Sequence, residues 1–238
     1  MSKKFWNFEN KNETTGALYL YGEISDITWW GDEITPSNFK KDLDKLGEIT
    51  QLDIYINSGG GDVFAGQTIN NMLKRHKAYK TVYIDGLAAS IASVIAMAGD
   101  TIIMPGNSMM MIHNAWAFVA GDSEQLLEMA AALEKVNTTI VGEYVRKTGL
   151  DAEKVTELMK AETWMTAGEA FGYGFADEVR EDVKIAASIN GTKITIGNIK
   201  VDANDYKNLP TERFEPEEPK QNINENLVKI IKIHKRRN

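Results

Sequence analysis

Short apolar segments, most of them bounded by Gly, Pro, Asn or Ser, predict a series of β-strands in the first three quarters of the chain. Positions 52–56 show the pattern most clearly, because apolar residues there are separated by polar or amphipathic ones, as in a strand with one buried face. The predicted strands cover residues 18–21, 52–56, 81–84, 101–104, 109–112 and 176–179.

Between these strands lie segments whose apolar residues recur every three or four positions, which is the spacing of an amphipathic helix. Thr35 and Pro36 supply an N-cap and a first helical position for the earliest of them. The predicted helices cover residues 35–47, 62–75, 87–98, 122–149, 151–160 and 166–171. This alternation of strands and helices predicts an α/β fold with a largely parallel sheet.

The sequence pattern changes after Glu181, and we expect the chain to form three regions. Residues 1–182 form the main folded domain. Residues 183–203 form a small β-hairpin, with Asn190 and Gly191 in a type I′ turn. Residues 204–238 contain three of the five prolines, many Glu residues and a basic end, so we expect a charged, flexible tail there.

Composition narrows the class of protein. The chain has 238 residues and a net charge of −7, which disfavours non-specific binding to the phosphates of nucleic acids. It contains no cysteine, which excludes disulfides, thiolate nucleophiles and cysteine-rich zinc sites. No apolar segment follows the two N-terminal lysines, and the largely apolar stretch 87–98, of 12 residues, is too short to cross a bilayer of roughly 30 Å. We expect a protein of the cytoplasm, with no membrane or nucleic-acid partner.

Few side chains are candidates for chemistry. His76 lies in a cationic helix end and His234 in the tail, whereas His113 directly follows an apolar strand. This leaves no set of histidines for a metal, and we expect neither a metal nor a cofactor. Ser90 lies among small residues at the start of a predicted helix, and Glu162 lies between two predicted helices. Taken singly, each of these residues also fits an ordinary structural role.

A triple glycine, Gly59 to Gly61, follows a strand and precedes a helix, so its main-chain N–H groups are free to face an anion or an oxyanion. Residues 61–68 have the spacing of a phosphate-binding P-loop. However, Gln67 occupies the position of the essential lysine, which argues against phosphate binding.

Four blocks taken together resemble the caseinolytic ClpP serine peptidases, over roughly residues 17–179. They are INSGGGDV at 56–63, GLAAS at 86–90, MIHN at 111–114 and ETWMTA at 162–167. The resemblance implies a ClpP/crotonase-like spiral of β-β-α units with a long handle helix. It also implies a catalytic role for Ser90, His113 and Glu162, an oxyanion hole from the N–H groups of Gly61 and Ile91, and substrate contacts from Gly60 and Asn114.

Two positions depart from that family's pattern. Gly59 replaces a usual proline, which leaves the N–H groups of the following residues in place. Glu162 replaces a usual aspartate, and its extra methylene requires a different distance from the histidine that it would orient. The rival acids are Glu157, Glu169 and Asp177, which also suit solvated helix or turn positions.

The region after Glu181 is similar to the ClpP-related head-maturation proteases of tailed phages and prophages. That similarity implies capsid or scaffold proteins as substrates, and the cytoplasm of a bacterium or infected host, or the prohead interior, as the location. The resemblance to the ClpP peptidases, together with the length and apolar stripe of the predicted helix 122–149, implies a homo-oligomeric ring, a heptamer or a stacked double ring. Any ATP-driven step would come from a separate ATPase as a further partner. The alternatives are a degradative ClpP fed by an ATPase unfoldase, a crotonase-type acyl-CoA enzyme, and a ring-forming scaffold with a vestigial triad.

Overall fold

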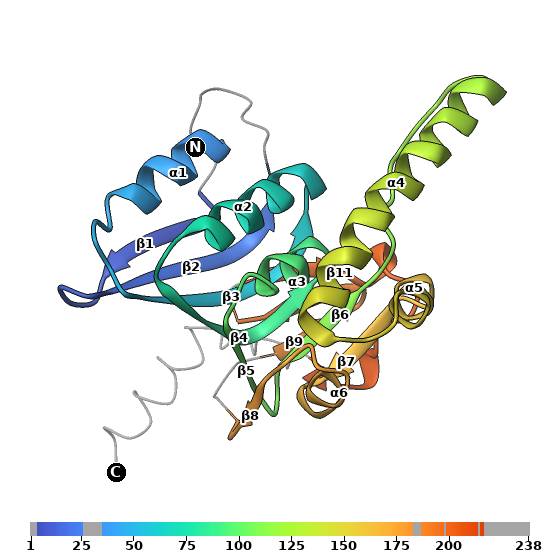
Figure 1. Ribbon diagram of the computed structural model, residues 1–238. Helices are drawn as coiled ribbons and strands as arrows, with labels where there is room; N and C mark the ends of the chain where they lie inside the picture. Colours follow the sequence, from blue (N-terminus) through green and yellow to red (C-terminus); the bar gives the residue numbers. More distant parts are fainter. Residues whose placement is uncertain (1–3, 26–34, 183–186, 198, 214, 217–238) are drawn as a thin grey trace, which may run out of the picture.

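The computed structural model describes residues 4–25, 35–182, 187–197, 199–213 and 215–216, which form two sheets with helices packed around the first (Figure 1). The first sheet has eight strands: β1 (Trp6–Asn10), β2 (Thr15–Ile24), β3 (Gln51–Gly61), β4 (Tyr79–Ala89), β5 (Thr101–Pro105), β6 (Met109–Ile112), β7 (Thr163–Thr166) and β8 (Glu178–Arg180). The strands β2, β3, β4, β5 and β8 are successive parallel neighbours. The predicted α/β fold with a largely parallel sheet is therefore confirmed.

Strand β4 changes its partner along its length. Its first half pairs with β5 through residues 81–83, and its second half pairs with β6 through residues 87–89. Strand β6 then pairs with β7 in antiparallel fashion. Because β4 ends directly before Ser90 and β6 ends directly before His113, this switch brings the two candidate side chains to the same end of the sheet.

Six helices complete the first unit: α1 (Pro36–Asp44), α2 (Val63–Arg75), α3 (Ile91–Ala96), α4 (Ser123–Thr148), α5 (Ala152–Lys160) and α6 (Ala167–Gly172). Helices α1 and α2 lie on one face of the sheet (Figure 1), above a core that includes Leu18, Ile54 and Ile84. Helix α4 has a capping box at Asp122 and a left-handed Gly149 at its end, so its ends agree with the predicted helix 122–149. Its first half extends beyond the rest of the molecule (Figure 1).

A second sheet, with the order β11-β10-β9-β12, is built from the C-terminal part of the described chain. Its strands are β9 (Ala187–Asn190), β10 (Lys193–Ile196), β11 (Ile199–Asp202) and β12 (Glu215–Pro216), with the short helices η1 (Ala203–Asp205) and η2 (Thr211–Arg213) between the last two. We refer to residues 187–216 as the C-terminal extension. Its Ile194, Ile196 and Val201 pack in one apolar cluster with Leu87 and Met111 of the first sheet.

The structure corrects four expectations. The segment 87–98 is not helical throughout, because β4 continues to Ala89 before α3 begins at Ile91. Residues 163–165, which lie between two predicted helices, and Thr166, the expected first residue of the second, form β7, and β1 was not predicted. The region expected as a hairpin contributes to a four-stranded sheet. Within the tail expected from residue 204, the described residues 204–213 and 215–216 include η2, β12 and most of η1, while residues 214 and 217–238 lie outside the described part of the chain.

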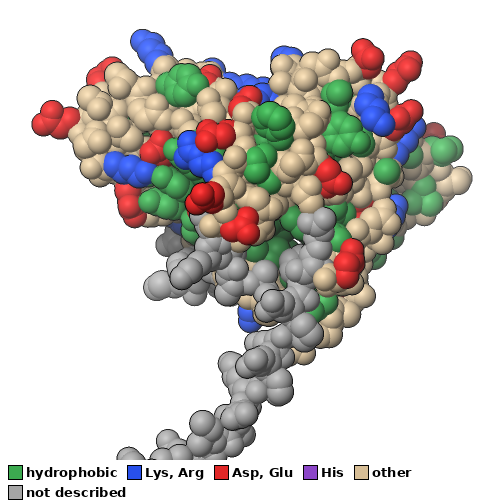
Figure 2. Space-filling model, turned by 90° about the horizontal axis from the view of Figure 1, so that it is seen from below, with side chains coloured by type: hydrophobic (Ala, Val, Ile, Leu, Met, Phe, Trp, Pro, Cys, Tyr) green, Lys and Arg blue, Asp and Glu red, His purple; other side chains and the backbone are tan. Residues whose placement is uncertain are grey.

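Surface charge is mixed. On the face seen in Figure 2, acidic and basic side chains are interspersed and neither sign gathers into a continuous patch. Among the described residues, no helix is both long enough and apolar enough to span a bilayer.

Candidate active site

Ser90 occupies a strained position between β4 and α3. Its backbone has φ 55° and ψ −130°, a combination that non-glycine residues rarely adopt. The Ser90 N–H donates to the carbonyl of Met111 at 2.9 Å, which ties this junction to β6. Strain of this kind is retained where a side chain must be aimed precisely, as at the nucleophile of many hydrolases.

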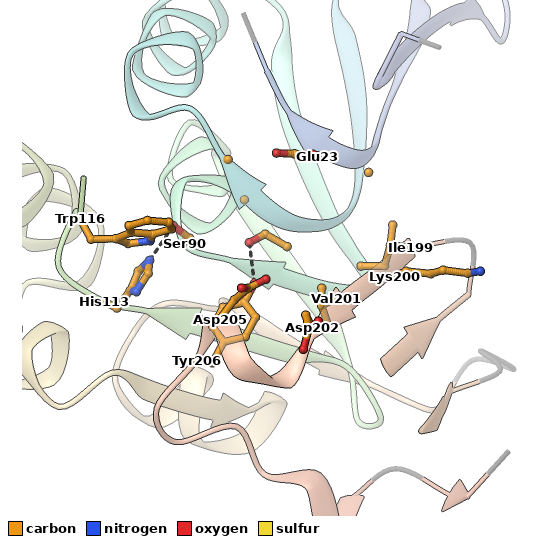
Figure 3. A pocket seen from close by; sticks show the side chains of 14 residues that line it. Glu23, Ser90, His113, Trp116, Ile199, Lys200, Val201, Asp202, Asp205 and Tyr206 are labelled. Atoms are coloured by element: carbon orange, nitrogen blue, oxygen red, sulfur yellow. Dashed lines mark hydrogen bonds between the residues drawn. The ribbon is translucent and has the colours of Figure 1, made fainter. Parts of the chain in front are cut away.

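His113 lies against Ser90. Its Nε2 is 2.8 Å from Ser90 Oγ (Figure 3). Burial lowers the pKa of the imidazole, and the charge of Lys207 lowers it further, whereas the charge of Glu162 raises it. Burial is the largest of these effects, so the ring is neutral at neutral pH and is able to accept a proton.

Gly59, Gly60 and Gly61, which we call the glycine turn, form the end of β3 and border the same site. Gly60 and Gly61 have φ values of 101° and 142°, which favour glycine. A Cβ built on Gly61 would lie 1.9 Å from the carbonyl oxygen of Ile24, so no side chain fits there. Asp62 N–H donates to that oxygen at 2.7 Å.

Glu162 is the second non-glycine residue of the described chain with a positive φ, at 49°, and its side chain is 7% exposed. Its Oε1 accepts three hydrogen bonds: from Lys207 N at 2.8 Å, from Asn208 N at 2.9 Å and from Trp164 Nε1 at 3.3 Å. The hydrogen bonds of the described residues include none between Glu162 and His113. The two side chains nevertheless border a common hollow, and the Glu162 charge acts on the His113 pKa.

A cleft of about 580 Å³ opens in front of Ser90 and His113 (Figure 3). One side is formed by the main domain, from the glycine turn, the end of β2 at Glu23, and Trp116. The opposite side is formed by β11 and η1 of the C-terminal extension, including Val201, Asp205 and Tyr206. The site is therefore built from both sheets.

The remaining predicted residues lie nearby. Ile91 follows Ser90 as the first residue of α3, and Asn114 borders the hollow that contains Glu162. The sequence did not point to the cleft residues of the extension, because they form no local motif and reach the site only by packing. Trp116 likewise lies outside the four blocks that carry the resemblance.

Other groups have different partners. Asp177 forms an ion pair with Lys147 at 2.8 Å, and Glu169 closes a capping box with Thr166. His76 lies at the end of α2. His234 lies outside the described residues. Within the described part of the chain, no three His, Asp or Glu side chains are grouped so as to hold a metal ion.

Comparison with known proteins supplies the family. A sequence model of the Clp protease family matches residues 41–183, more than half of the chain. The "ATP-dependent Clp protease proteolytic subunit" of Deinococcus radiodurans is 33% identical over 145 residues, which cover 60% of this chain and 71% of that protein. The proteins of the same name from Streptococcus equi subsp. equi and Streptococcus pneumoniae are 30% identical over 156 residues and 32% identical over 143 residues. These alignments cover 60% and 58% of this chain, and 76% and 72% of the streptococcal proteins. The chain therefore belongs to the Clp protease family of peptidases.

Proposed function

We propose that this protein is a serine endopeptidase in which Ser90 is the nucleophile and His113 the general base. The observation that carries the proposal is the 2.8 Å contact between Ser90 Oγ and His113 Nε2, made from a strained serine at the edge of a cleft. Ser90 Oγ attacks the scissile carbonyl carbon while its proton passes to His113 Nε2. The C–N bond then breaks, the amine takes that proton, and an acyl-enzyme remains. Water activated by His113 hydrolyses the acyl-enzyme.

The N–H groups of Gly61 and Ile91 are the proposed oxyanion hole. Gly61 borders the cleft beside Ser90, and Ile91 is the residue directly after the nucleophile, which supports both assignments. Gly60 and Asn114 are the proposed substrate contacts. Gly60 borders the cleft directly, and Asn114 lies beside His113 in the adjoining hollow.

Glu162 is the proposed third catalytic residue, acting by orienting His113. Its burial, its strained backbone and the effect of its charge on the His113 pKa support this role. A carboxylate that accepts from Nδ1–H fixes the tautomer in which Nε2 is free to receive the serine proton. In the structure, Oε1 of Glu162 is taken by other donors, so this contact would be made by Oε2.

Labelling with a fluorophosphonate probe tests the proposal directly. We expect the wild-type protein to be labelled at Ser90 and to cleave fluorogenic peptides, and Ser90→Ala to do neither. Ser123→Ala, at the exposed start of α4, is the matched control and should behave as the wild type. Peptide cleavage by Ser90→Ala at the wild-type rate would refute the proposal. An unlabelled, inactive wild type would favour the vestigial scaffold, and stabilisation by coenzyme A the acyl-CoA enzyme.

For the substrate, we propose capsid or scaffold proteins cut during phage head assembly. Support comes from the resemblance of the C-terminal extension, which lies beyond the segment matched by the family model. The second candidate is general degradation together with a separate ATPase, which the names of the relatives favour. Co-expression with neighbouring capsid gene products, comparing product masses for wild type and Ser90→Ala, separates the two. Either function would be carried out in the bacterial or phage-infected host cytoplasm or inside the prohead.

We also propose a homo-oligomeric ring, a heptamer or a stacked double ring, joined through α4. The first half of this helix extends away from the rest of the molecule (Figure 1). It carries exposed apolar side chains, of which Leu127 is 72% exposed, and Phe118 just before it is 99% exposed. Apolar surface of this kind is typical of an interaction site.

A further inference from the structure

The segment Tyr206 to Asn208 of the C-terminal extension contacts two different parts of the candidate site. The Tyr206 hydroxyl donates to the carbonyl of Gly59 at 3.2 Å (Figure 3). The next two residues donate their main-chain N–H groups to Glu162 Oε1, and Asn208 Nδ2 donates to the carbonyl of Ala161 at 2.7 Å. One short segment is therefore bonded both to the glycine turn and to the proposed third catalytic residue.

The tyrosine ring is held in place. It packs edge-on against Trp164, with ring centroids 5.2 Å apart, and Trp164 in turn donates to Glu162. Aromatic pairs in this arrangement are typically worth about 0.5–1.5 kcal/mol beyond the area that they bury. The hydroxyl of Tyr206 is thus a fixed donor and not a freely rotating surface group.

The glycine turn packs directly against the proposed nucleophile, Ser90. A Cβ built on Gly60 would lie 2.6 Å from Ser90 Cβ, so the two residues are already in close contact. A Cβ on Gly59 would lie 2.9 Å from Val201 Cγ1, which shows that β11 packs against the other side of the turn. Movement of the Gly59 carbonyl would therefore shift Gly60 relative to Ser90, and with it the N–H of Gly61.

The chemistry of the hydroxyl suits this role. Burial, together with the charges of Asp205, Glu162 and Glu23, raises the pKa of Tyr206 to about 12. The group remains protonated, and so remains a donor, over the whole neutral range.

We propose that Tyr206 is a positioning residue, which holds the glycine turn so that the Gly61 N–H is aimed at the developing oxyanion. This inference rests on the proposed function. It assigns the C-terminal extension a role in positioning the active site, although the extension lies outside the segment matched by the family model. Because the Gly61 N–H interacts most strongly with the charge that develops in the transition state, losing the hydroxyl lowers kcat and leaves KM nearly unchanged.

Tyr206→Phe tests this inference, since it removes the hydroxyl and keeps the ring. We expect kcat to fall roughly tenfold, less than the loss of about 10²–10³ on removing an oxyanion donor outright. Affinity for a peptide boronate, which mimics the tetrahedral intermediate, should fall by the same factor, whereas affinity for a product peptide should not change. Tyr79→Phe is the matched control, because its hydroxyl lies 2.6 Å from Thr101 Oγ1 and does not border the cleft.

The possible results distinguish failure of this inference from failure of the proposed function. Wild-type kcat and boronate affinity in Tyr206→Phe, or a rise in KM alone, would overturn the inference and leave the proposed function intact. An inactive wild type, or an active Ser90→Ala, would overturn both. If Tyr206→Phe melts at a lower temperature than Tyr79→Phe, the fluorophosphonate labelling rate per folded molecule decides the matter. A slower rate supports positioning, and an unchanged rate refutes it.

Discussion

Gly60 lies so close to Ser90 that the space for even a methyl group on Gly60 is taken by the serine Cβ, 2.6 Å from the position that the methyl carbon would occupy. Gly60 also has φ 101°, a conformation that L-residues rarely adopt. Gly60→Ala is therefore expected to displace the nucleophile. Misplacement of a catalytic group by about 1 Å can lower the rate about 10²-fold, so we expect a loss of at least that size in kcat.

Peptidase assays on purified Gly60→Ala check this expectation, with Gly168→Ala in α6 as the control. A Cβ on Gly168 meets nothing within 4 Å and its φ is not positive, so that variant should keep full activity. Equal activities in the two variants would show that the contact between Gly60 and Ser90 has no catalytic importance.

Glu162→Gln should be nearly as damaging as Ser90→Ala. The amide keeps an oxygen for the N–H groups of Lys207 and Asn208 but loses the charge that stabilises an imidazolium. In another serine peptidase, loss of the orienting carboxylate costs about 10⁴ in kcat. Glu162→Asp should cause a partial loss, because the carboxylate is retracted by one methylene.

The rival acids provide the controls. Glu157→Gln, Glu169→Gln and Asp177→Asn should retain kcat. If one of them is inactive while Glu162→Gln cleaves peptide at the wild-type rate, the third catalytic residue has been misassigned, although Ser90 and His113 would still stand.

The pKa of His113 should respond in opposite directions to its two charged neighbours. Burial places the pKa below the value of about 6.5 for an unperturbed histidine, so the acid limb of kcat/KM should lie below that pH. Removing the negative charge in Glu162→Gln should lower the pKa further. Removing the positive charge in Lys207→Gln should raise it.

NMR titration of the His113 ring measures both shifts without relying on activity. His76, at the end of α2, serves as an internal reference and should titrate unchanged in both variants. Shifts of the same sign in the two variants would contradict the electrostatic account.

Assembly should depend on the exposed part of α4. Leu127→Glu places a charge on a side chain that is 72% exposed in the single chain. If that side chain is buried between subunits, the charge is costly there and the ring should dissociate. Light scattering at micromolar concentration reports the mass. Ala152→Glu, which adds the same charge to an exposed position of α5, should leave the mass unchanged. A monomeric wild type would rule out the proposed ring.

Local patterns predicted the fold class well and the ends of elements less well. The strand at residues 52–56 was recognised from its alternation, but β3 continues to Gly61 because Gly60 and Gly61 still pair with β2. Glycine is depleted in strands, so its propensity argued against that continuation. Residues 87–89 are apolar and fully buried, and such a run does not distinguish a strand from a helix by its periodicity.

The residues of the candidate site also differ in whether the sequence predicts them. Ser90, His113 and Glu162 lie in short blocks that are recognisable along the sequence, whereas Tyr206 has no local signal. Its hydrogen-bond partner Gly59 is 147 positions away in the chain, and the contact exists only because the second sheet packs beneath the first. Long-range packing of this kind has no counterpart in residue spacing.

The hydrogen bonds from Lys207 and Asn208 to Glu162 also determine when, during synthesis of the chain, the candidate site can be complete. During synthesis, Asn208 follows Glu162 by 46 positions, which corresponds to roughly 2–9 s at about 5–20 residues per second. Throughout that interval a growing chain already contains Ser90 and His113 but lacks the donors that hold the acid and the glycine turn. The contacts that complete the proposed active site can therefore form only after residues 206–208 have been synthesised.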